Sequence, residues 1–278
     1  MTDVEAGAGG DGLAPAPAPR DEPLLLGRDG PAAILTINRP ERLNALTFGM
    51  FAGLPGVLAE AAALPGVRVL VVRGAGTRSF SAGADIAEFA AVRSTPEQAA
   101  AYDEAVLAAE RALASFPAPT IAAVHGHCYG GGCSVALACD MRFAARAARF
   151  AITPAKLGLV YPLRSTKRLV DLVGPSRAKI MLMAATDYDA ARAREFGLVD
   201  EVFDDAGALD AGVREFAALL ASRSAVTQRA VKETVARIAD GTAHDDESHA
   251  ALRAAALASG DYAEGVRAFL ERRPPNFG

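Results

Sequence analysis

The sequence reads Ser79-Phe80-Ser81-Ala82-Gly83-Ala84-Asp85-Ile86 in one stretch and Val124-His125-Gly126-His127-Cys128-Tyr129-Gly130-Gly131-Gly132-Cys133 in another. Each stretch follows an apolar segment typical of a buried strand, and each offers backbone N–H groups with little side-chain bulk around them. Two such N–H groups that converge on one point form an oxyanion hole, which holds negative charge developing on a carbonyl oxygen. The two stretches together therefore predict a site for a carbonyl compound.

The glycines at 130–132 allow close approach of a ligand, and the helix expected after them points its positive end at the same place. A phosphate-binding loop would need a following Gly-Lys-Ser/Thr, and a dinucleotide fingerprint would need spaced glycines; neither is present. Taken alone, the three glycines also fit a tight turn with close helix packing. A second strand-to-glycine turn in the same half of the chain favours the site.

The surrounding pattern predicts an α/β fold, with strands and helices alternating before a helical C-terminal third. Apolar, β-branched runs predict strands at 32–38, 67–72, 120–124 and 141–144. Helices are expected at 48–64, 96–115, 132–139, 163–173, 176–184, 189–196, 206–221, 224–239, 246–258 and 261–272. We expect a disordered Ala/Pro/Gly-rich tail at 1–23, a core at 24–205 and a helical oligomerisation region at 206–278.

Composition limits the function. The 278 residues carry a net charge of −4 and no Lys/Arg-rich run, which argues against nucleic-acid binding. Apolar residues make up 51%, many of them alanine, and no apolar run approaches the roughly 20 residues that span a bilayer. The spacing of Cys128, Cys133 and Cys139 fits no common zinc site, so we expect packed, reduced thiols and no bound metal. A soluble cytoplasmic protein is predicted, since the tail lacks a signal-peptide pattern.

Several motifs together resemble the crotonase superfamily, the group of enoyl-CoA hydratases, isomerases and their relatives. The resemblance covers nearly all of the chain after the tail. It rests on segments 38–46, 80–85, 126–140, 150–158, 197–200 and 264–274.

This resemblance implies a fold of repeated ββα units, C-terminal helices that assemble trimers or dimers of trimers, and acyl-CoA substrates. It implies that the amides of Ala82 and Gly131 hold the thioester oxygen. No separate cofactor is expected, because coenzyme A is part of the substrate. The positions expected to contact substrate are Arg42, Ala45, Ala82, Gly83, Ala84, Asp85, Ile86, Tyr129, Gly130, Gly131, Ser134, Pro154 and Phe269.

Two positions depart from the hydratases of the family. Those enzymes place one glutamate three residues after the Gly131 position and a second just after the Phe150 turn, where this chain has Ser134 and Pro154. Hydration needs a base to activate water and an acid to protonate the α-carbon, and neither residue supplies one. Decarboxylation of a malonyl-type thioester needs the hole but no base, and an anionic glutamate would repel the substrate carboxylate.

The segment 150–161 and the ending 273–277 also resemble methylmalonyl-CoA decarboxylases, which share the Thr-Pro and the downstream Tyr. On this resemblance Thr153 and Tyr161 are candidate catalytic residues that hydrogen-bond or orient the substrate carboxylate. The decarboxylases carry a histidine where this chain has Ala84, so no role of that histidine transfers.

Other readings of the site stay open. Asp85 fits a helix N-cap better than a catalytic acid, and Tyr129 fits either an acyl-pocket wall or the core. A hydratase or isomerase could use relocated groups such as Tyr161 or His127. A non-catalytic acyl-CoA-binding protein is the third possibility.

Overall fold

The computed structural model describes residues 22–277. Its centre is a six-stranded sheet in the order β1-β2-β3-β5-β7-β10, in which β1 and β2 are antiparallel and all other neighbours are parallel. The strands are β1 (Leu24–Asp29), β2 (Ala32–Ile37), β3 (Val69–Gly74), β5 (Thr120–Val124), β7 (Met141–Ala145) and β10 (Glu201–Phe203). Every residue of β3 and β5 is buried, as expected for central parallel strands covered on both faces.

A second, four-stranded sheet lies beyond the carboxyl ends of these strands. It has the order β4-β6-β8-β9 and consists of β4 (Ser79–Ser81), β6 (His127–Tyr129), β8 (Arg149–Ala151) and β9 (Tyr188–Asp189). β4 follows β3, β6 follows β5, and β8 follows β7, so three successive strand pairs each contribute one strand to each sheet. A helix follows each pair, which confirms the expected ββα repetition. The sequence did not signal the short strands, because two or three residues are too few to show a period.

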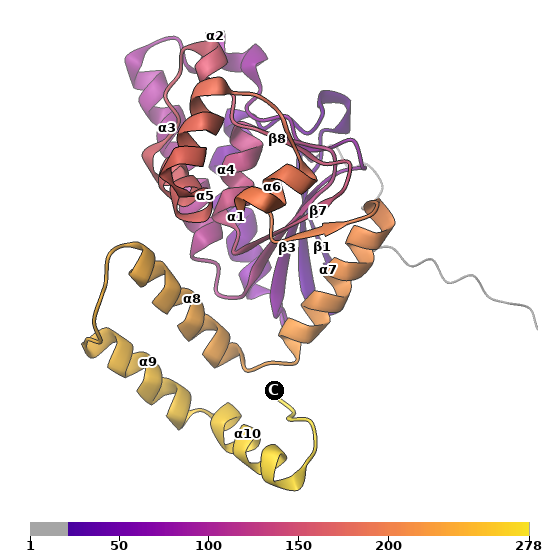
Figure 1. The fold of residues 1–278 in the computed structure, drawn as a ribbon, viewed down its shortest axis with the longest axis vertical. Helices are drawn as coiled ribbons and strands as arrows, with labels where there is room; N and C mark the ends of the chain where they lie inside the picture. Colours follow the sequence, from indigo (N-terminus) through magenta and orange to yellow (C-terminus); the bar gives the residue numbers. More distant parts are fainter. Residues whose placement is uncertain (1–21, 278) are drawn as a thin grey trace, which may run out of the picture.

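Helices cover both faces of the larger sheet (Figure 1). α1 (Phe48–Ala63), α3 (Pro96–Ala114) and α4 (Gly131–Ala138) pack on one face. On the other face, α7 (Ala206–Ala221) buries Leu209, Val213 and Ala217 against β3, β5 and β7. The expected boundary at residue 205 is therefore misplaced, because α7 belongs to the core and the core ends after it.

The other helices of the core are α2 (Phe89–Val92), α5 (Leu163–Ala184) and α6 (Ala190–Phe196), and short 3-10 turns lie at Pro40–Arg42, Ile86–Glu88 and Pro154–Leu157. α5 is interrupted at Gly174, whose backbone angles of φ 78° and ψ 161° are not helical. Two helices were expected there, 163–173 and 176–184, and the break falls between them.

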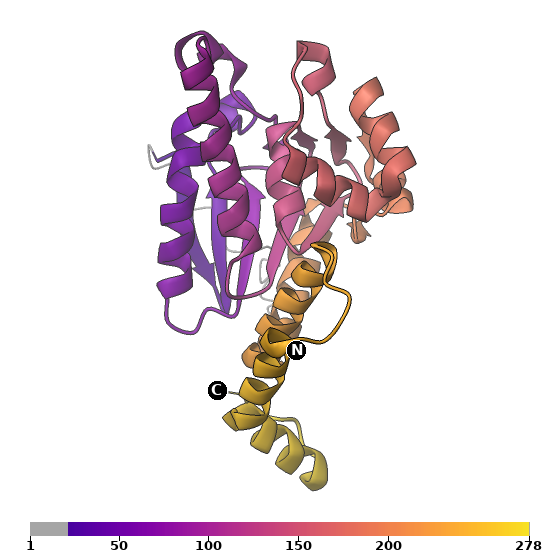
Figure 2. The same cartoon turned by 90° about the vertical axis from the view of Figure 1, so that its left-hand side faces the viewer.

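The remaining helices form an arm that extends away from the core (Figures 1 and 2). They are α8 (Ala225–Ala239), α9 (Glu247–Ala258) and α10 (Gly260–Glu271), and α8 and α9 bury none of their residues. Large apolar side chains on the arm are exposed: Val231, Val235, Ile238, Leu257, Tyr262, Phe269 and Leu270.

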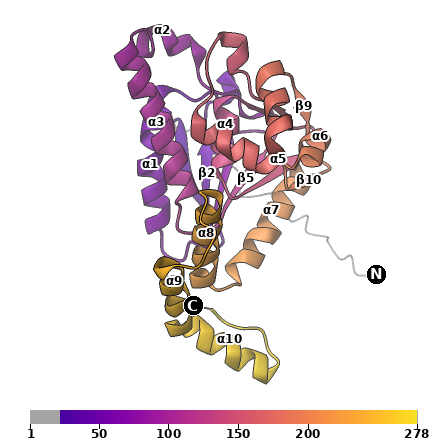
Figure 3. The same ribbon diagram turned by 60° about the vertical axis from the view of Figure 1, so that its left-hand side comes forward.

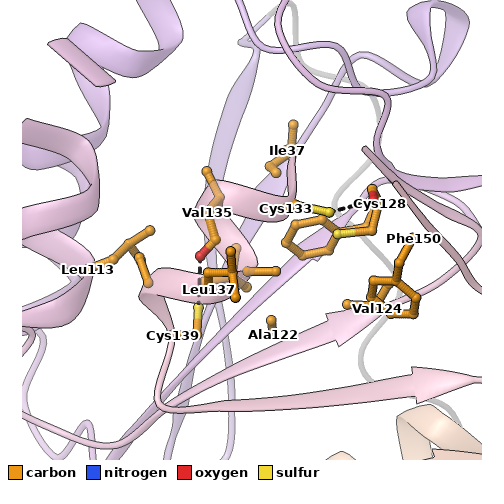
Figure 4. Packing of buried hydrophobic residues seen from close by; sticks show 14 of the residues in the cluster. Ile37, Leu113, Ala122, Val124, Cys128, Cys133, Val135, Leu137, Cys139 and Phe150 are labelled. Atoms are coloured by element: carbon orange, nitrogen blue, oxygen red, sulfur yellow. Dashed lines mark hydrogen bonds between the residues drawn. The ribbon is translucent and has the colours of Figure 1, made fainter. Parts of the chain in front are cut away.

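The three cysteines are free and buried in the main core cluster (Figure 4). The thiol of Cys133 donates to the carbonyl of Cys128 at 2.8 Å. The prediction of packed, reduced thiols is confirmed. Within residues 22–277, no helix combines the length and the apolar character required to cross a membrane. The expected tail lies almost wholly outside the described residues.

Candidate active site

The first glycine stretch is held in place by a buried asparagine. Asn44 adopts a left-handed backbone (φ 57°) that asparagine tolerates better than most residues. Its side-chain amide donates to the carbonyls of Ala75 and Ser79 at 3.0 and 2.7 Å, and its carbonyl accepts from the amide of Arg39 at 3.0 Å. These bonds tie the turn after β2 to the start of β4, so the turn fixes where the glycine stretch begins.

The backbone of this stretch is bonded to the same turn. The amide of Ala82 donates to the carbonyl of Leu43 at 2.9 Å, the amide of Leu46 donates to Gly83, and the amide of Asp85 donates to Leu46, both at 2.8 Å. The expectation that Ala82 supplies a donor to the site is therefore corrected, because its N–H is already engaged inside the protein.

Among the amides of residues 82–85, only that of Ala84 makes no hydrogen bond to another described residue. Ala84 is the centre of a parallel bridge to Leu46, in which the hydrogen bonds are made by its neighbours Gly83 and Asp85. Successive peptide groups of an extended chain point to opposite sides, so the N–H of Ala84 faces away from Leu46. Among residues 22–277 it has no hydrogen-bond acceptor.

The second glycine stretch supplies a matching amide. Gly131 is the first residue of α4, where an N–H has no partner within the helix. The preceding Gly130 has φ 45° and ψ −109°, a conformation open to glycine, and its own amide donates to Ala151 at 2.9 Å. The turn thus leaves the N–H of Gly131 at the positive end of the helix.

The two amides lie side by side. A Cβ atom built on Gly131 would come within 3.2 Å of the nitrogen of Ala84, and one built on Gly83 would come within 3.3 Å of the nitrogen of Gly131. Only glycine fits at these two positions without displacing the neighbouring backbone. The paired N–H groups are a geometry that can hold one carbonyl oxygen.

A pocket of about 440 Å³ opens next to these amides. Most of the predicted site residues line it: Ala82, Gly83, Ala84, Ile86, Gly130, Gly131, Ser134, Thr153, Pro154 and Tyr161. One wall is aromatic, with the ring of Tyr102 within 5.9 Å of that of Phe51 and 5.6 Å of that of Phe89, centroid to centroid. The lining carries the cations Arg93, Arg111 and Arg164 and, among the described residues, the single carboxylate Asp103, which pairs with Arg93 at 2.8 Å.

Tyr161 lies behind the glycine turn. Its hydroxyl donates to the carbonyl of Gly130 at 3.0 Å. Burial raises the pKa of Tyr161 well above its usual value, and the neighbouring Cys133 and Glu110 add to the rise, so the hydroxyl keeps its proton. Thr153 is half-buried, and a Cβ on Gly130 would lie 3.4 Å from its hydroxyl oxygen.

Five of the expected contact residues do not line the pocket. Asp85 caps the turn at Ile86–Glu88 and pairs with Arg39 at 2.8 Å, which confirms the capping interpretation. The hydroxyl of Tyr129 donates to Asp187 at 2.8 Å instead of facing the pocket. Ala45 is buried, its carbonyl bonded by Arg39. Arg42 is exposed, and Phe269 is 81% exposed on α10.

One ionisable residue beside the site was not predicted. Glu110 of α3 is 1% exposed, and its partners come from α4 and α5. Figure 3 shows α4 between α3 and α5. Glu110 was missed because an acidic residue on an Ala-rich helix is usually solvated. The signal was present, since positions 106, 109, 110 and 113 follow the spacing of one helix face and all four are buried.

The fold and the site define the class: an α/β protein of ββα units whose pocket offers two adjacent backbone amides to a carbonyl oxygen. The profile of the family described as Enoyl-CoA hydratase/isomerase matches residues 29–278. The chain belongs to the enoyl-CoA hydratase/isomerase family, whose members act on CoA thioesters.

Individual relatives agree with this assignment. A probable enoyl-CoA hydratase of Mycobacterium bovis is 33% identical over 92% of this chain and 98% of its own length. The crotonyl-CoA hydratase of Syntrophomonas wolfei is 34% identical, with the same two coverages. The crystal structure of a putative enoyl-CoA hydratase/isomerase family protein from Hyphomonas neptunium is similar at a TM-score of 0.89, with 37% identity over 93% of this chain and 98% of that chain.

Proposed function

We propose that this protein stabilises the enolate of a CoA thioester between the amides of Ala84 and Gly131, and that its reaction is the decarboxylation of a short or branched malonyl-type CoA. The electrons of the breaking carbon–carbon bond move onto the thioester oxygen, CO2 leaves, and the enolate is then protonated at its α-carbon. One lost donor in such a hole typically costs about 3–4 kcal/mol of transition-state stabilisation.

The main support for this proposal is the pair of adjacent amides that make no hydrogen bond within the protein. The wall of the same pocket has Ser134 and Pro154 at the two positions where a hydratase needs carboxylates. Two of the three arginines in the lining are paired, Arg93 with Asp103 and Arg111 with Glu104. Among the described residues Arg164 has no carboxylate within salt-bridge distance, so it is the cation available to attract a substrate carboxylate or a phosphate of CoA. In this proposal Thr153, which lines the pocket beside Gly130, hydrogen-bonds the substrate carboxylate.

The test is incubation of the purified protein with methylmalonyl-CoA and ethylmalonyl-CoA, followed by mass spectrometry of the CoA products. We expect propionyl-CoA and butyryl-CoA to form faster than in buffer. Loss of CO2 no faster than in the protein-free control would refute the decarboxylase proposal.

Hydration is the second candidate, favoured by the hydratase names of the relatives. It requires a relocated acid or base, for which the sequence suggested Tyr161 or His127. The hydroxyl of Tyr161 is bonded to the carbonyl of Gly130, and His127 contacts the hydroxyl of Tyr129 at 3.0 Å and is not among the residues that line the pocket, so neither group favours hydration. The loss of crotonyl-CoA absorbance under the same conditions measures hydration. Binding of CoA thioesters without turnover of any of these compounds would instead support the non-catalytic alternative.

We further propose that the arm formed by α8, α9 and α10 assembles trimers or dimers of trimers. Exposed apolar side chains such as Phe269 and Leu270, 81% and 75% exposed, support this, because large exposed apolar patches usually mark an interface. In such an assembly Phe269 would reach the substrate only in a neighbouring subunit. We also propose that the protein resides in the cytoplasm.

A further inference from the structure

Glu110 is a buried carboxylate for which the oxyanion chemistry gives no role. It lies on α3 with 1% of its surface exposed. Two residues of α5 bond the carboxyl: the hydroxyl of Ser165 donates to Oε1 at 2.6 Å, and Nη1 of Arg168 donates to Oε2 at 2.6 Å. Burying an ionised carboxylate is costly even when it is paired, so such a group needs a reason.

The α4 side of Glu110 connects it to the pocket. Ser134 lies within hydrogen-bonding reach of the Glu110 carboxyl and also lines the pocket. Its hydroxyl donates to the carbonyl of Gly131 at 2.9 Å, which places it one helical turn after the amide expected to hold the thioester oxygen. A serine hydroxyl is both a donor and an acceptor, so Ser134 has the chemistry to pass a proton between the Glu110 carboxyl and a group in the pocket.

The surroundings of Glu110 disfavour its charged form. Burial raises the pKa of Glu110, against the opposing effects of Ser165, Arg168 and Ser134. Tyr161, before α5, is the ionisable group next to Glu110 on the side of the glycine turn, and Cys133 and Cys128 lie near Tyr161 in turn. Burial keeps the Tyr161 hydroxyl protonated. Arg168 is therefore the cation that would stabilise the carboxylate once its proton has left.

We propose that Glu110 is the proton store of the site and exchanges a proton with the α-carbon of the bound acyl group through the hydroxyl of Ser134. In the protonating direction, the Ser134 proton passes to the α-carbon of the enolate and forms the new C–H bond. The Glu110 proton passes at the same time to Oγ of Ser134. Glu110 is left as a carboxylate beside Arg168 and is reprotonated from solvent.

This inference rests on the proposed enolate but not on decarboxylation, so its test avoids CO2 loss. Butyryl-CoA is incubated in D2O with the protein, and deuterium entering the α-position is followed by mass spectrometry between pD 4 and 9. Removal of the α-proton needs the carboxylate form. The wild-type rate should therefore rise with pD through a transition above the ordinary glutamate pKa of about 4.3 and then level off.

Glu110→Gln keeps the size and most hydrogen bonds of the side chain but cannot exchange a proton. We expect its exchange rate to fall by about 100-fold or more and to lose the pD transition. Ser134→Ala should give a similar fall, because the link is broken while Glu110 remains. Glu97→Gln, at an exposed position in the first turn of the same helix, is the matched control and should exchange like the wild type.

A merely structural ion pair between α3 and α5 predicts a different result. Glu110→Gln would then lower the melting temperature while leaving the exchange rate and its pD transition unchanged in the folded protein. That outcome overturns the inference, as does the absence of exchange in the wild type. If Glu110→Gln does not fold, wild-type exchange in Ser134→Ala overturns it.

The two proposals can fail separately. Exchange that depends on Glu110 without any CO2 loss from malonyl-type substrates supports the proton store and removes the decarboxylase. Decarboxylation with exchange unaffected by either variant does the reverse.

Discussion

The hydroxyl of Tyr161 donates to the carbonyl of Gly130, and that carbonyl shares one peptide group with the N–H of Gly131. A hydrogen bond to the oxygen of a peptide group polarises it and makes its N–H a stronger donor. It also holds the turn that precedes α4 in its unusual backbone conformation. In the proposed site Tyr161 would therefore act on the thioester oxygen through this peptide, as a positioning residue, whereas the sequence led us to expect a direct contact with the substrate.

Tyr161→Phe removes this bond without changing the ring. We expect the free energy of unfolding to fall by about 1 kcal/mol and kcat to fall about five- to tenfold, with little change in KM. Kinetics with the best substrate and urea denaturation measure the two effects. A variant with an unchanged kcat would show that the polarised peptide contributes nothing to the reaction.

Gly131→Ala should damage the site more than the fold. The added Cβ would lie 3.2 Å from the nitrogen of Ala84 and 3.2 Å from Cζ of Phe51, so the hole must distort to admit it. We expect kcat/KM to fall by about 100-fold. Gly53→Ala in α1, where no atom lies within 4 Å of the new Cβ, is the control and should stabilise the helix by about 0.5–1 kcal/mol. Equal activity of the two variants would contradict this account of the hole.

Asn44→Ala is expected to destabilise the whole protein by about 3 kcal/mol, because two buried carbonyls lose their donor and alanine disfavours the left-handed backbone. Asn44→Gly removes the hydrogen bonds but accepts the backbone, and it should be the more stable of the two variants. Urea denaturation followed by circular dichroism gives both values. A loss below 1 kcal/mol in Asn44→Ala would mean that the turn does not hold β4.

The proposed role of the arm in assembly can be tested by measuring the mass of the particles in solution. Light scattering of the wild type should give three or six subunits per particle, and Phe269→Asp with Leu270→Asp should shift it to smaller particles, since two charges would be buried in the interface. A folded wild type that is monomeric at micromolar concentration would rule out the proposed assembly.

The sequence predicted the α/β class and most helices because those segments are long and periodic. α7 was assigned to the wrong region, since an amphipathic pattern shows that a helix buries one face but not which surface covers it. The choice between Ala82 and Ala84 was beyond the sequence, because it depends on a hydrogen bond to the carbonyl of Leu43 in a distant turn. Glu110 could have been found from its helical spacing. Its contact with Ser134 required the packing of α3 on α4.

The central claim is that the amides of Ala84 and Gly131 hold the thioester oxygen. Infrared spectroscopy of bound butyryl-CoA, with carbon-13 at the thioester carbonyl, measures this directly, because hydrogen bonds to the oxygen lower its stretching frequency. We predict a clear downward shift on binding to the wild type, a largely lost shift in Ala84→Pro, and a retained shift in folded Ala82→Pro, which removes only the bond to Leu43. A shift that survives in Ala84→Pro and disappears in Ala82→Pro would contradict the assignment.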